Sequence, residues 1–159
     1  MFHVESYSGT KEENYALLQK QLKALLEGEK NVIANLSNAC ALLNQFLTEV
    51  NWVGFYLYDD QELVLGPFQG LPACVRIPLG KGVCGTAALK RKTITVDDVH
   101  QFPGHIACDA ASQSEIVIPL VKEGRLLGVL DIDSPIKSRF DSIDQEQLQK
   151  FVDVLLHYI

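Results

Sequence analysis

The 159-residue sequence has few basic residues and lacks the long apolar runs of membrane proteins. Lysine and arginine total 14 against 20 acidic residues, and the net charge of −6 leaves no basic surface that could follow the phosphates of a nucleic acid. No apolar run approaches the ~20 residues that cross a bilayer, and the first residues lack the basic and apolar segments of a secretory signal. We therefore expect a cytoplasmic protein that binds neither nucleic acids nor membranes.

The four cysteines lack the spacing of a zinc site and the setting of a static disulfide framework. Cytosolic reductants keep structural thiols reduced. Cys74, Cys84 and Cys108 stand ten and twenty-four residues apart, with no C-x-x-C pair among them. His105 lies three residues before Cys108 and His100 is nearby, but we interpret both histidines as hydrogen-bonding loop residues. The sequence therefore predicts no bound metal and no bound cofactor.

Helical periodicity is present toward both ends of the chain. Thr10 and Glu13 form a capping-box pattern before apolar residues at helical spacing, and Gly28 is suited to follow the end of that helix. Cys40 lies on the apolar stripe of a second helix, so we assign it to the core and give it no role. The expected helices cover about residues 11–27, 31–47 and 142–157, with a short one over 82–90.

Between about residues 50 and 134, runs of β-branched and aromatic residues bounded by turn residues indicate strands. Six such runs predict a mostly antiparallel sheet. With helices before and after it, the sheet defines a single α+β domain over residues 1–159, with the N- and C-terminal helices packed on one face. The runs are VNWVGFYLY, ELVLG ended by Gly66-Pro67, CVRIPL, TITV, EIVIPLV and RLLGVLDID.

Cys108 lies in a long segment without regular periodicity, residues 97–114. Loops of this length in compact domains are usually functional or disordered. An exposed cytosolic thiol without a task would be an oxidation liability. From the residues alone, a reactive and a structural Cys108 remain equal alternatives, and packing beside a strand is the simpler interpretation of Cys74 or Cys84 taken singly.

Three acidic residues are expected to gather on one face of the sheet. Asp131 and Asp133 stand two apart in a strand and so share a face. A three-residue hairpin turn over residues 122–124 would place Glu115 opposite Asp131, whereas a register change of one residue would send Glu115 to the other face. A solvated polar face is the alternative interpretation. We prefer a cation site, because clustered carboxylates cost energy unless a cation lies among them or a proton is shared.

Four segments carry a family resemblance: NWVGFYL, GPFQGLPACVRIPLGKGVCGTAA, FPGHIACDAASQSEIVIPL and GVLDIDSP. Together they resemble the free methionine-(R)-sulfoxide reductases, which are built on a GAF domain. The resemblance extends from about Asn51 to Asp133 and keeps the three-cysteine spacing, which sensory GAF domains do not carry. It implies an oxidoreductase, active against oxidative stress, that reduces free L-methionine (R)-S-oxide through a cysteine sulfenic acid and an intramolecular disulfide. It also implies recycling by thioredoxin and a homodimer.

The same resemblance implies a role for individual residues. Cys108 would attack the substrate, and Cys74 or Cys84 would resolve the oxidised enzyme, with Cys74 and Cys108 the favoured disulfide pair. Sulfoxide reduction needs a thiolate and a proton donor for the departing oxygen, and a carboxyl group among like charges suits the second task. An aromatic side chain suits the S-methyl group. The residues implied to line the pocket are Trp52, Tyr56, Glu115, Asp131 and Asp133.

Two other classes of function fit parts of the sequence. One is a GAF module that senses a small ligand or nitric oxide without turnover, although such modules normally adjoin an output domain. The other is a zinc-binding hydrolase. Thioredoxin-coupled oxidation of NADPH that depends on methionine sulfoxide would exclude the sensor, and metal analysis would decide on the hydrolase.

Overall fold

The computed structural model describes residues 6–106 and 108–159. Residues 1–5 of the expected domain and residue 107 of the expected loop lie outside the described residues. The described residues form four α-helices, one short 3-10 helix and six strands. Their order is α1 (Lys11–Leu26), α2 (Val32–Phe46), β1 (Trp52–Tyr58), β2 (Glu62–Gln69), β3 (Arg76–Pro78), α3 (Gly82–Lys90), β4 (Ile94–Val96), η1 (Val99–Gln101), β5 (Ser114–Lys122), β6 (Arg125–Ser134) and α4 (Ser142–Leu156).

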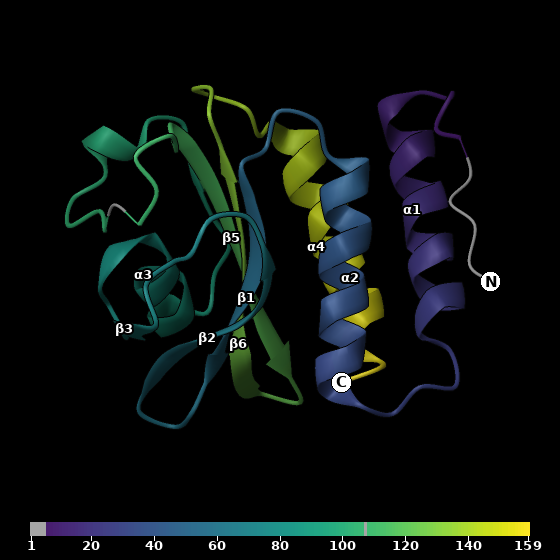
Figure 1. The fold of residues 1–159 in the computed structure, drawn as a ribbon, viewed down its shortest axis with the longest axis horizontal. Helices are drawn as coiled ribbons and strands as arrows, with labels where there is room; N and C mark the ends of the chain where they lie inside the picture. Colours follow the sequence, from purple (N-terminus) through teal and green to yellow (C-terminus); the bar gives the residue numbers. More distant parts are fainter. Residues whose placement is uncertain (1–5, 107) are drawn as a thin grey trace.

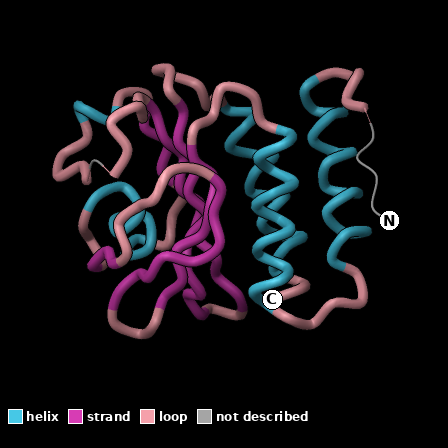
Figure 2. Tube along the Cα trace, viewed as in Figure 1, coloured by secondary structure: helices cyan, strands magenta, loops and turns pink. Residues whose placement is uncertain are grey.

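The strands form one antiparallel sheet in the order β3-β2-β1-β6-β5-β4. α2 and α4 lie against one face, α1 packs outside them, and α3 lies on the opposite face (Figure 1). Figure 2 shows the three longer helices gathered on one side of the strands. This arrangement confirms the predicted α+β architecture. Among the described residues, no helix combines the length and the apolar character that crossing a bilayer requires.

Side-chain caps explain where three of the helices begin. The Thr10 hydroxyl accepts a hydrogen bond from the Glu13 backbone N–H, and Asn31 caps α2 in the same way. At α4 both halves of a capping box are present, between Asp141 and Asp144. The sequence patterns therefore located these helix starts correctly.

Alternation along the strands divides the apolar residues into two cores. Side chains such as Phe55, Ile116 and Leu130 face the helices and form the larger core with α1, α2 and α4. Side chains such as Val117 and Val129 point to the opposite face and pack under α3. The central strands β1, β5 and β6 therefore contribute alternate residues to the two cores.

β2 differs from the sequence prediction, because it does not end at Gly66-Pro67 but continues to Gln69. Its pairing with β1 shifts between Gly54 and Tyr56, so that the Gly66-Pro67 pair forms a bulge opposite Phe55. At a bulge the missing N–H of proline costs no regular ladder bond. The longer strand brings Phe68 opposite Gly54.

Candidate active site

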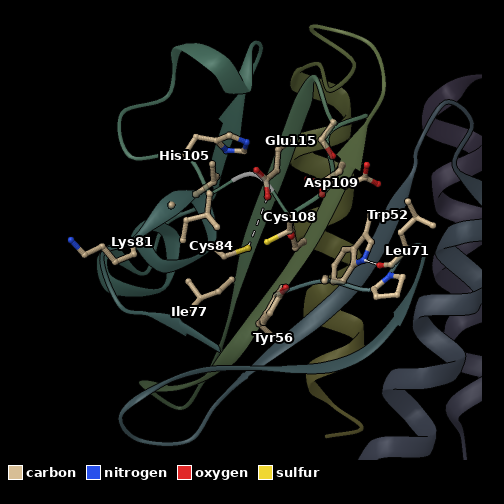
Figure 3. A pocket seen from close by; sticks show the side chains of 18 residues that line it. Trp52, Tyr56, Leu71, Ile77, Lys81, Cys84, His105, Cys108, Asp109 and Glu115 are labelled. Atoms are coloured by element: carbon tan, nitrogen blue, oxygen red, sulfur yellow. Dashed lines mark hydrogen bonds between the residues drawn. The ribbon is translucent and has the colours of Figure 1, made fainter. Parts of the chain in front are cut away.

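A pocket lies on the face of the sheet that carries α3, between the central strands, the start of α3 and the loops that precede β3 and β5 (Figure 3). It brings together seven of the eight side chains predicted from the sequence. The eighth, Cys74, forms a disulfide with Cys108, which lines the pocket. The predicted residues that line the pocket are Trp52, Tyr56, Cys84, Cys108, Glu115, Asp131 and Asp133.

The hairpin between β5 and β6 differs from the prediction in two respects. Its turn contains two residues, Glu123 and Gly124, with positive φ angles of 53° and 76°. This is the backbone of a two-residue hairpin whose twist matches the strands. A bulge also shifts the register between Leu120 and Val121. The predicted three-residue turn is therefore wrong.

The two differences compensate each other at the acidic residues. Each moves the register by one position, so Glu115 keeps its place on the pocket face but pairs with Asp133. The predicted pairing of Glu115 with Asp131 is wrong, because Val117 stands opposite Asp131. With only one of the two differences, Glu115 would point into the larger core.

The three carboxyl groups lie side by side: Glu115 and Asp131 are buried, each 6% exposed, and Asp133 is partly buried. Burial raises the pKa of Glu115 well above its ordinary value, and the charges of Asp131 and Asp133 raise it further. Burial and the charge of Asp131 likewise raise the pKa of Asp133 well above its ordinary value, and burial raises that of Asp131. The cluster can therefore hold a proton at a pH at which isolated carboxyl groups are ionised.

Asp131 leaves one acceptor of this cluster without a partner. Its Oδ1 atom is buried and receives no hydrogen bond from the described residues. An unsatisfied buried acceptor costs about 1–3 kcal/mol. A ligand that carries a positively charged hydrogen-bond donor would supply both the missing bond and the missing charge.

Two of the predicted thiols are joined on one wall of the pocket. Cys108, from the loop before β5, forms a disulfide with Cys74, from the segment between β2 and β3, and their Cα atoms are 5.8 Å apart. The bond lies across the sheet from Cys40, whose thiol donates to the backbone oxygen of Val53 at 2.9 Å. Burial raises the pKa of Cys40 to about 12, which keeps that thiol protonated and unreactive.

Cys84 is a free thiol that faces the acidic cluster from α3. Its Sγ atom lies 4.0 Å from Oε2 of Glu115, the contact dashed in Figure 3. Burial, followed by the charges of Asp131 and Glu115, raises its pKa well above the ordinary value. This environment disfavours a Cys84 thiolate, in contrast to what a primary nucleophile requires.

An aromatic wall closes the pocket beside the disulfide. The ring of Trp52 is stacked with those of Tyr56 and Phe68, at centroid distances of 5.8 and 5.2 Å. The Trp52 indole N–H donates to the backbone oxygen of Leu71 at 3.1 Å, and the Tyr56 hydroxyl donates to that of Cys74 at 2.9 Å. Both rings therefore also hold the segment that carries Cys74.

Sequence reasoning missed a polar network that anchors the Cys108 loop. Asn51 Nδ2 donates to Asp109 Oδ2 at 2.9 Å and to Ser112 Oγ at 3.1 Å. Asp109 directly follows Cys108, so the network ties the Cys108 loop to the start of β1. A polar pair this far apart in the chain has no periodicity by which the sequence could reveal it.

His105, predicted to be an ordinary loop histidine, also lines the pocket. Burial and the neighbouring His100 lower its pKa, so its ring is neutral near pH 7. Its Nδ1 atom is buried without a hydrogen-bond partner among the described residues. The other lining residues that the sequence did not single out are Leu71, Pro72, Ala73, Ile77, Lys81, Gly82, Val83, Ile106, Asp109 and Ser112.

Among the described residues, three pocket side chains have a geometry that could hold a metal ion. Ligand atoms of Cys84, Glu115 and Asp131 all lie within 4.8 Å of one another. This set differs from His100, His105 and Cys108, which the sequence spacing had brought into consideration.

A sheet backed by helices, with a pocket under a short helix and loops on its other face, is the architecture of a GAF domain, here with thiols and carboxyl groups inside the pocket. The family model for the GAF domain matches residues 29–155. The free methionine-R-sulfoxide reductase of Escherichia coli is 54% identical over 142 residues, which cover 89% of this chain and 86% of that protein.

Two solved structures are similar throughout. The reduced form of fRMsr from Staphylococcus aureus has 55% identity and a TM-score of 0.89, and the match covers 98% of this chain and 99% of that one. The free methionine-R-sulfoxide reductase from Neisseria meningitidis, solved in complex with its substrate, has 42% identity and a TM-score of 0.95, over 99% and 95% of the two chains. The chain belongs to the GAF-domain family of free methionine-R-sulfoxide reductases.

Proposed function

We propose that the protein reduces free L-methionine (R)-S-oxide to L-methionine with Cys108 as the nucleophile. The observation that carries the proposal is the placement of the Cys74–Cys108 pair next to a buried acidic cluster in one pocket. The names of the Escherichia coli and Neisseria meningitidis relatives support the substrate and its R configuration. A GAF module that only senses a ligand needs neither the thiol pair nor the proton-holding carboxyl groups.

The first step transfers the sulfoxide oxygen to the enzyme. The Cys108 thiolate attacks the substrate sulfur and forms a sulfur–sulfur bond while the oxygen takes up a proton. The resulting hydroxyl group then moves to the Cys108 sulfur as the sulfur–oxygen and sulfur–sulfur bonds to the substrate sulfur break, so that methionine and a Cys108 sulfenic acid result. The thiol loses two electrons, and the sulfoxide gains them. Cys108 suits this step because its loop reaches the pocket, whereas Cys84 is buried among carboxyl groups that oppose its ionisation.

The second step forms a disulfide. The Cys74 thiol attacks the sulfenic sulfur, a Cys74–Cys108 bond forms, and water leaves. The two residues already have a separation that allows this bond. Thioredoxin, the proposed external reductant, would then return both residues to thiols by exchange, and Cys84 would act as a helper thiol.

The acidic cluster has two tasks in this scheme. The raised pKa of Glu115 and Asp133 allows one of them to donate the proton to the departing oxygen. The unsatisfied Oδ1 atom of Asp131 is suited to the α-ammonium group of a free amino acid. Methionine sulfoxide within a polypeptide has no α-ammonium group, which explains why the substrate would be the free amino acid.

The aromatic wall has the complementary task of holding the apolar end of the substrate. Trp52 and Tyr56 present rings next to the thiol pair, and each ring is fixed by a hydrogen bond from its polar atom. A fixed ring can contact the S-methyl group and orient the sulfur toward Cys108 without a further loss of side-chain freedom.

The setting of the protein is part of the proposal. A dithiol that must be reduced after each turnover requires a reducing compartment, which favours the cytoplasm. The family resemblance favours a homodimer. Light scattering during gel filtration measures the mass of the assembly. A monomer at working concentrations would contradict the proposed homodimer but not the proposed activity.

The proposal is tested by oxidation of NADPH in the presence of thioredoxin and thioredoxin reductase. We expect oxidation only when free methionine sulfoxide is added, with the R epimer consumed and the S epimer left. The matched control is Cys108→Ser, which retains the pocket but lacks the nucleophile. The absence of oxidation with either epimer of free methionine sulfoxide would overturn the proposed function.

A further inference from the structure

The pocket contains a set of side chains that a cationic substrate does not fully explain. Cys84 points from α3 at the acidic cluster, and its Sγ atom lies 4.0 Å from Oε2 of Glu115. Asp131 completes a group whose ligand atoms all lie within 4.8 Å of one another. Proton transfer and ammonium binding need carboxyl groups but no buried third thiol.

A second observation concerns the hydrogen bonding of Asp131. Asp131 is 6% exposed, lines the pocket, and has an Oδ1 atom that no described residue contacts by a hydrogen bond. Buried acceptors are nearly always paired, so the free Oδ1 atom marks a position for a positive ligand. The Cys84 sulfur atom, which is close to that position, favours a ligand that also binds sulfur.

We propose that Cys84, Glu115 and Asp131 form a binding site for a thiophilic divalent cation of the zinc class. A set of one sulfur and two carboxylate oxygens suits Zn²⁺ or Co²⁺ better than Mg²⁺ or Ca²⁺, which prefer oxygen alone. Tetrahedral zinc separates such ligands by roughly 3.5 Å, so the three side chains need to close by about 1 Å. Three protein ligands leave a fourth position open toward the pocket.

Binding of the ion changes the protonation of the site in a defined way. The Cys84 thiol must lose its proton to coordinate the metal, and that proton leaves to solvent. The two positive charges of the ion then offset the thiolate and one of the carboxylates. An ion in this position would exclude a substrate ammonium group from Asp131; this consequence, unlike the binding itself, rests on the proposed function.

The test is a titration of the disulfide form with Co²⁺, followed by absorption. When Cys74 and Cys108 are bonded, Cys40 and Cys84 are the free thiols, so a thiolate-to-cobalt charge-transfer band reports on one of these two. We expect a band that saturates at one Co²⁺ per chain, and Zn²⁺ should displace it. The matched variants are Cys84→Ser, which should lose the band, and Cys40→Ser, which should keep it.

Asp131→Asn provides a second criterion and should weaken Co²⁺ binding by at least about tenfold, since even residues that only orient a metal ligand are worth that much. The proposal is overturned by a wild-type protein that gives no band or by a band that persists in Cys84→Ser. If Cys84→Ser fails to fold, as judged by circular dichroism, unchanged affinity in Asp131→Asn overturns it instead. The readout needs no turnover, so an inactive protein that binds Co²⁺ would contradict the proposed function and leave this site intact.

Discussion

The two faces of the sheet are made from the same strands, but one face packs into an apolar core and the other lines the pocket. In β6, Leu130 and Ile132 face the helices and are fully buried in an apolar core, whereas Asp131 and Asp133 face the pocket. Glu115 in β5 adds a third carboxyl group to the pocket face. Alternate residues of one strand therefore contribute to the apolar core and to the lining of the pocket.

The difference between the faces shows how the fold tolerates an unfavourable cluster. Each fully buried apolar side chain of the helical face contributes about 1.5–3 kcal/mol to folding. On the pocket face, burial of carboxyl groups and a free acceptor works against folding. The helical face holds the strands in place, and the pocket face can then keep groups with raised pKa values close together.

The largest expected effect separates the thiols of the two faces. Cys108→Ser should lower even the first turnover by at least about a thousandfold, because no other thiol can take the oxygen. Cys40→Ser, on the helical face, should change the rate little, since a serine hydroxyl can also donate to the Val53 oxygen. Methionine release in a single turnover without thioredoxin measures both. Release by Cys108→Ser at the wild-type rate would disprove the assignment.

The next effect concerns recycling on the pocket face. A Cys74→Ser, Cys84→Ser double variant should release one methionine per active site and then stop, because the Cys108 sulfenic acid has no resolving thiol. A rapid-quench experiment with thioredoxin present measures the burst and the later rate. The single Cys84→Ser variant is the control and should retain more steady-state activity than Cys74→Ser. Full steady-state activity in the double variant would contradict the scheme.

A smaller effect should distinguish two glycines of the β1–β2 hairpin. A Cβ atom at Gly54 would lie 2.4 Å from Cβ of Phe68 and 2.7 Å from the Trp52 ring, so Gly54→Ala must displace the aromatic wall. We expect a loss of about 1–3 kcal/mol in stability, and KM should rise by about tenfold or more as the ring that positions the substrate moves. Gly66→Ala is the control: its Cβ atom meets the Phe55 backbone and Leu57 at 3.1–3.2 Å, so KM should not change. Equal effects on KM would contradict the role of the wall.

A further expected effect is on the pH dependence of stability. Because the pKa of Glu115 is raised in the folded state, its contribution to stability is complete below the unfolded-state pKa and is lost as the pH rises through the folded-state pKa. Glu115→Gln should therefore gain stability relative to wild type between about pH 5 and pH 8, by about 1.4 kcal/mol for each unit of the shift inside that range. Urea unfolding at several pH values measures the difference.

Asp141, at the start of α4, provides the control for this comparison. Burial raises its pKa, but the hydrogen bonds with the Asp144 backbone, Lys11 and the Asp144 side chain, together with the charge of Lys11, outweigh burial and lower the pKa to about 2. Its contribution is present above the unfolded-state pKa and is lost as the pH falls through about 2. The difference in the free energy of unfolding between Asp141→Asn and wild type should thus stay constant over the pH range in which the difference between Glu115→Gln and wild type changes. A flat profile for Glu115→Gln would show that the cluster does not hold a proton.

The sequence predicted the elements of the fold but not the details that complete the site. Helix starts at Thr10 and Asp141 and the strand runs follow from local patterns, so they could be read directly. The face of Glu115 was predicted correctly although its partner was not, because the short turn and the bulge at Leu120 shift the register by two positions in total. A bulge depends on packing between strands and leaves no reliable local pattern.

The contacts around Cys108 illustrate the same limit. The resemblance implied a role for Cys74, Cys84 and Cys108, but the hydrogen bonds of Asn51 to Asp109 and of Tyr56 to the Cys74 backbone join segments that are distant in sequence. Such contacts exist only after the sheet has formed. The free Oδ1 atom of Asp131 is likewise a property of the folded pocket.

The central claim is that the acidic cluster of the pocket face selects a free amino acid, and it is tested most directly by a comparison of two substrates. The wild-type enzyme is assayed with free methionine (R)-sulfoxide and with its N-acetyl derivative, which lacks the α-ammonium group. Leaving the buried carboxylates without their cation costs about 3–5 kcal/mol, so kcat/KM should fall by about two to three and a half decades for the acetylated compound. Nearly equal kcat/KM values for the two compounds would contradict the claim.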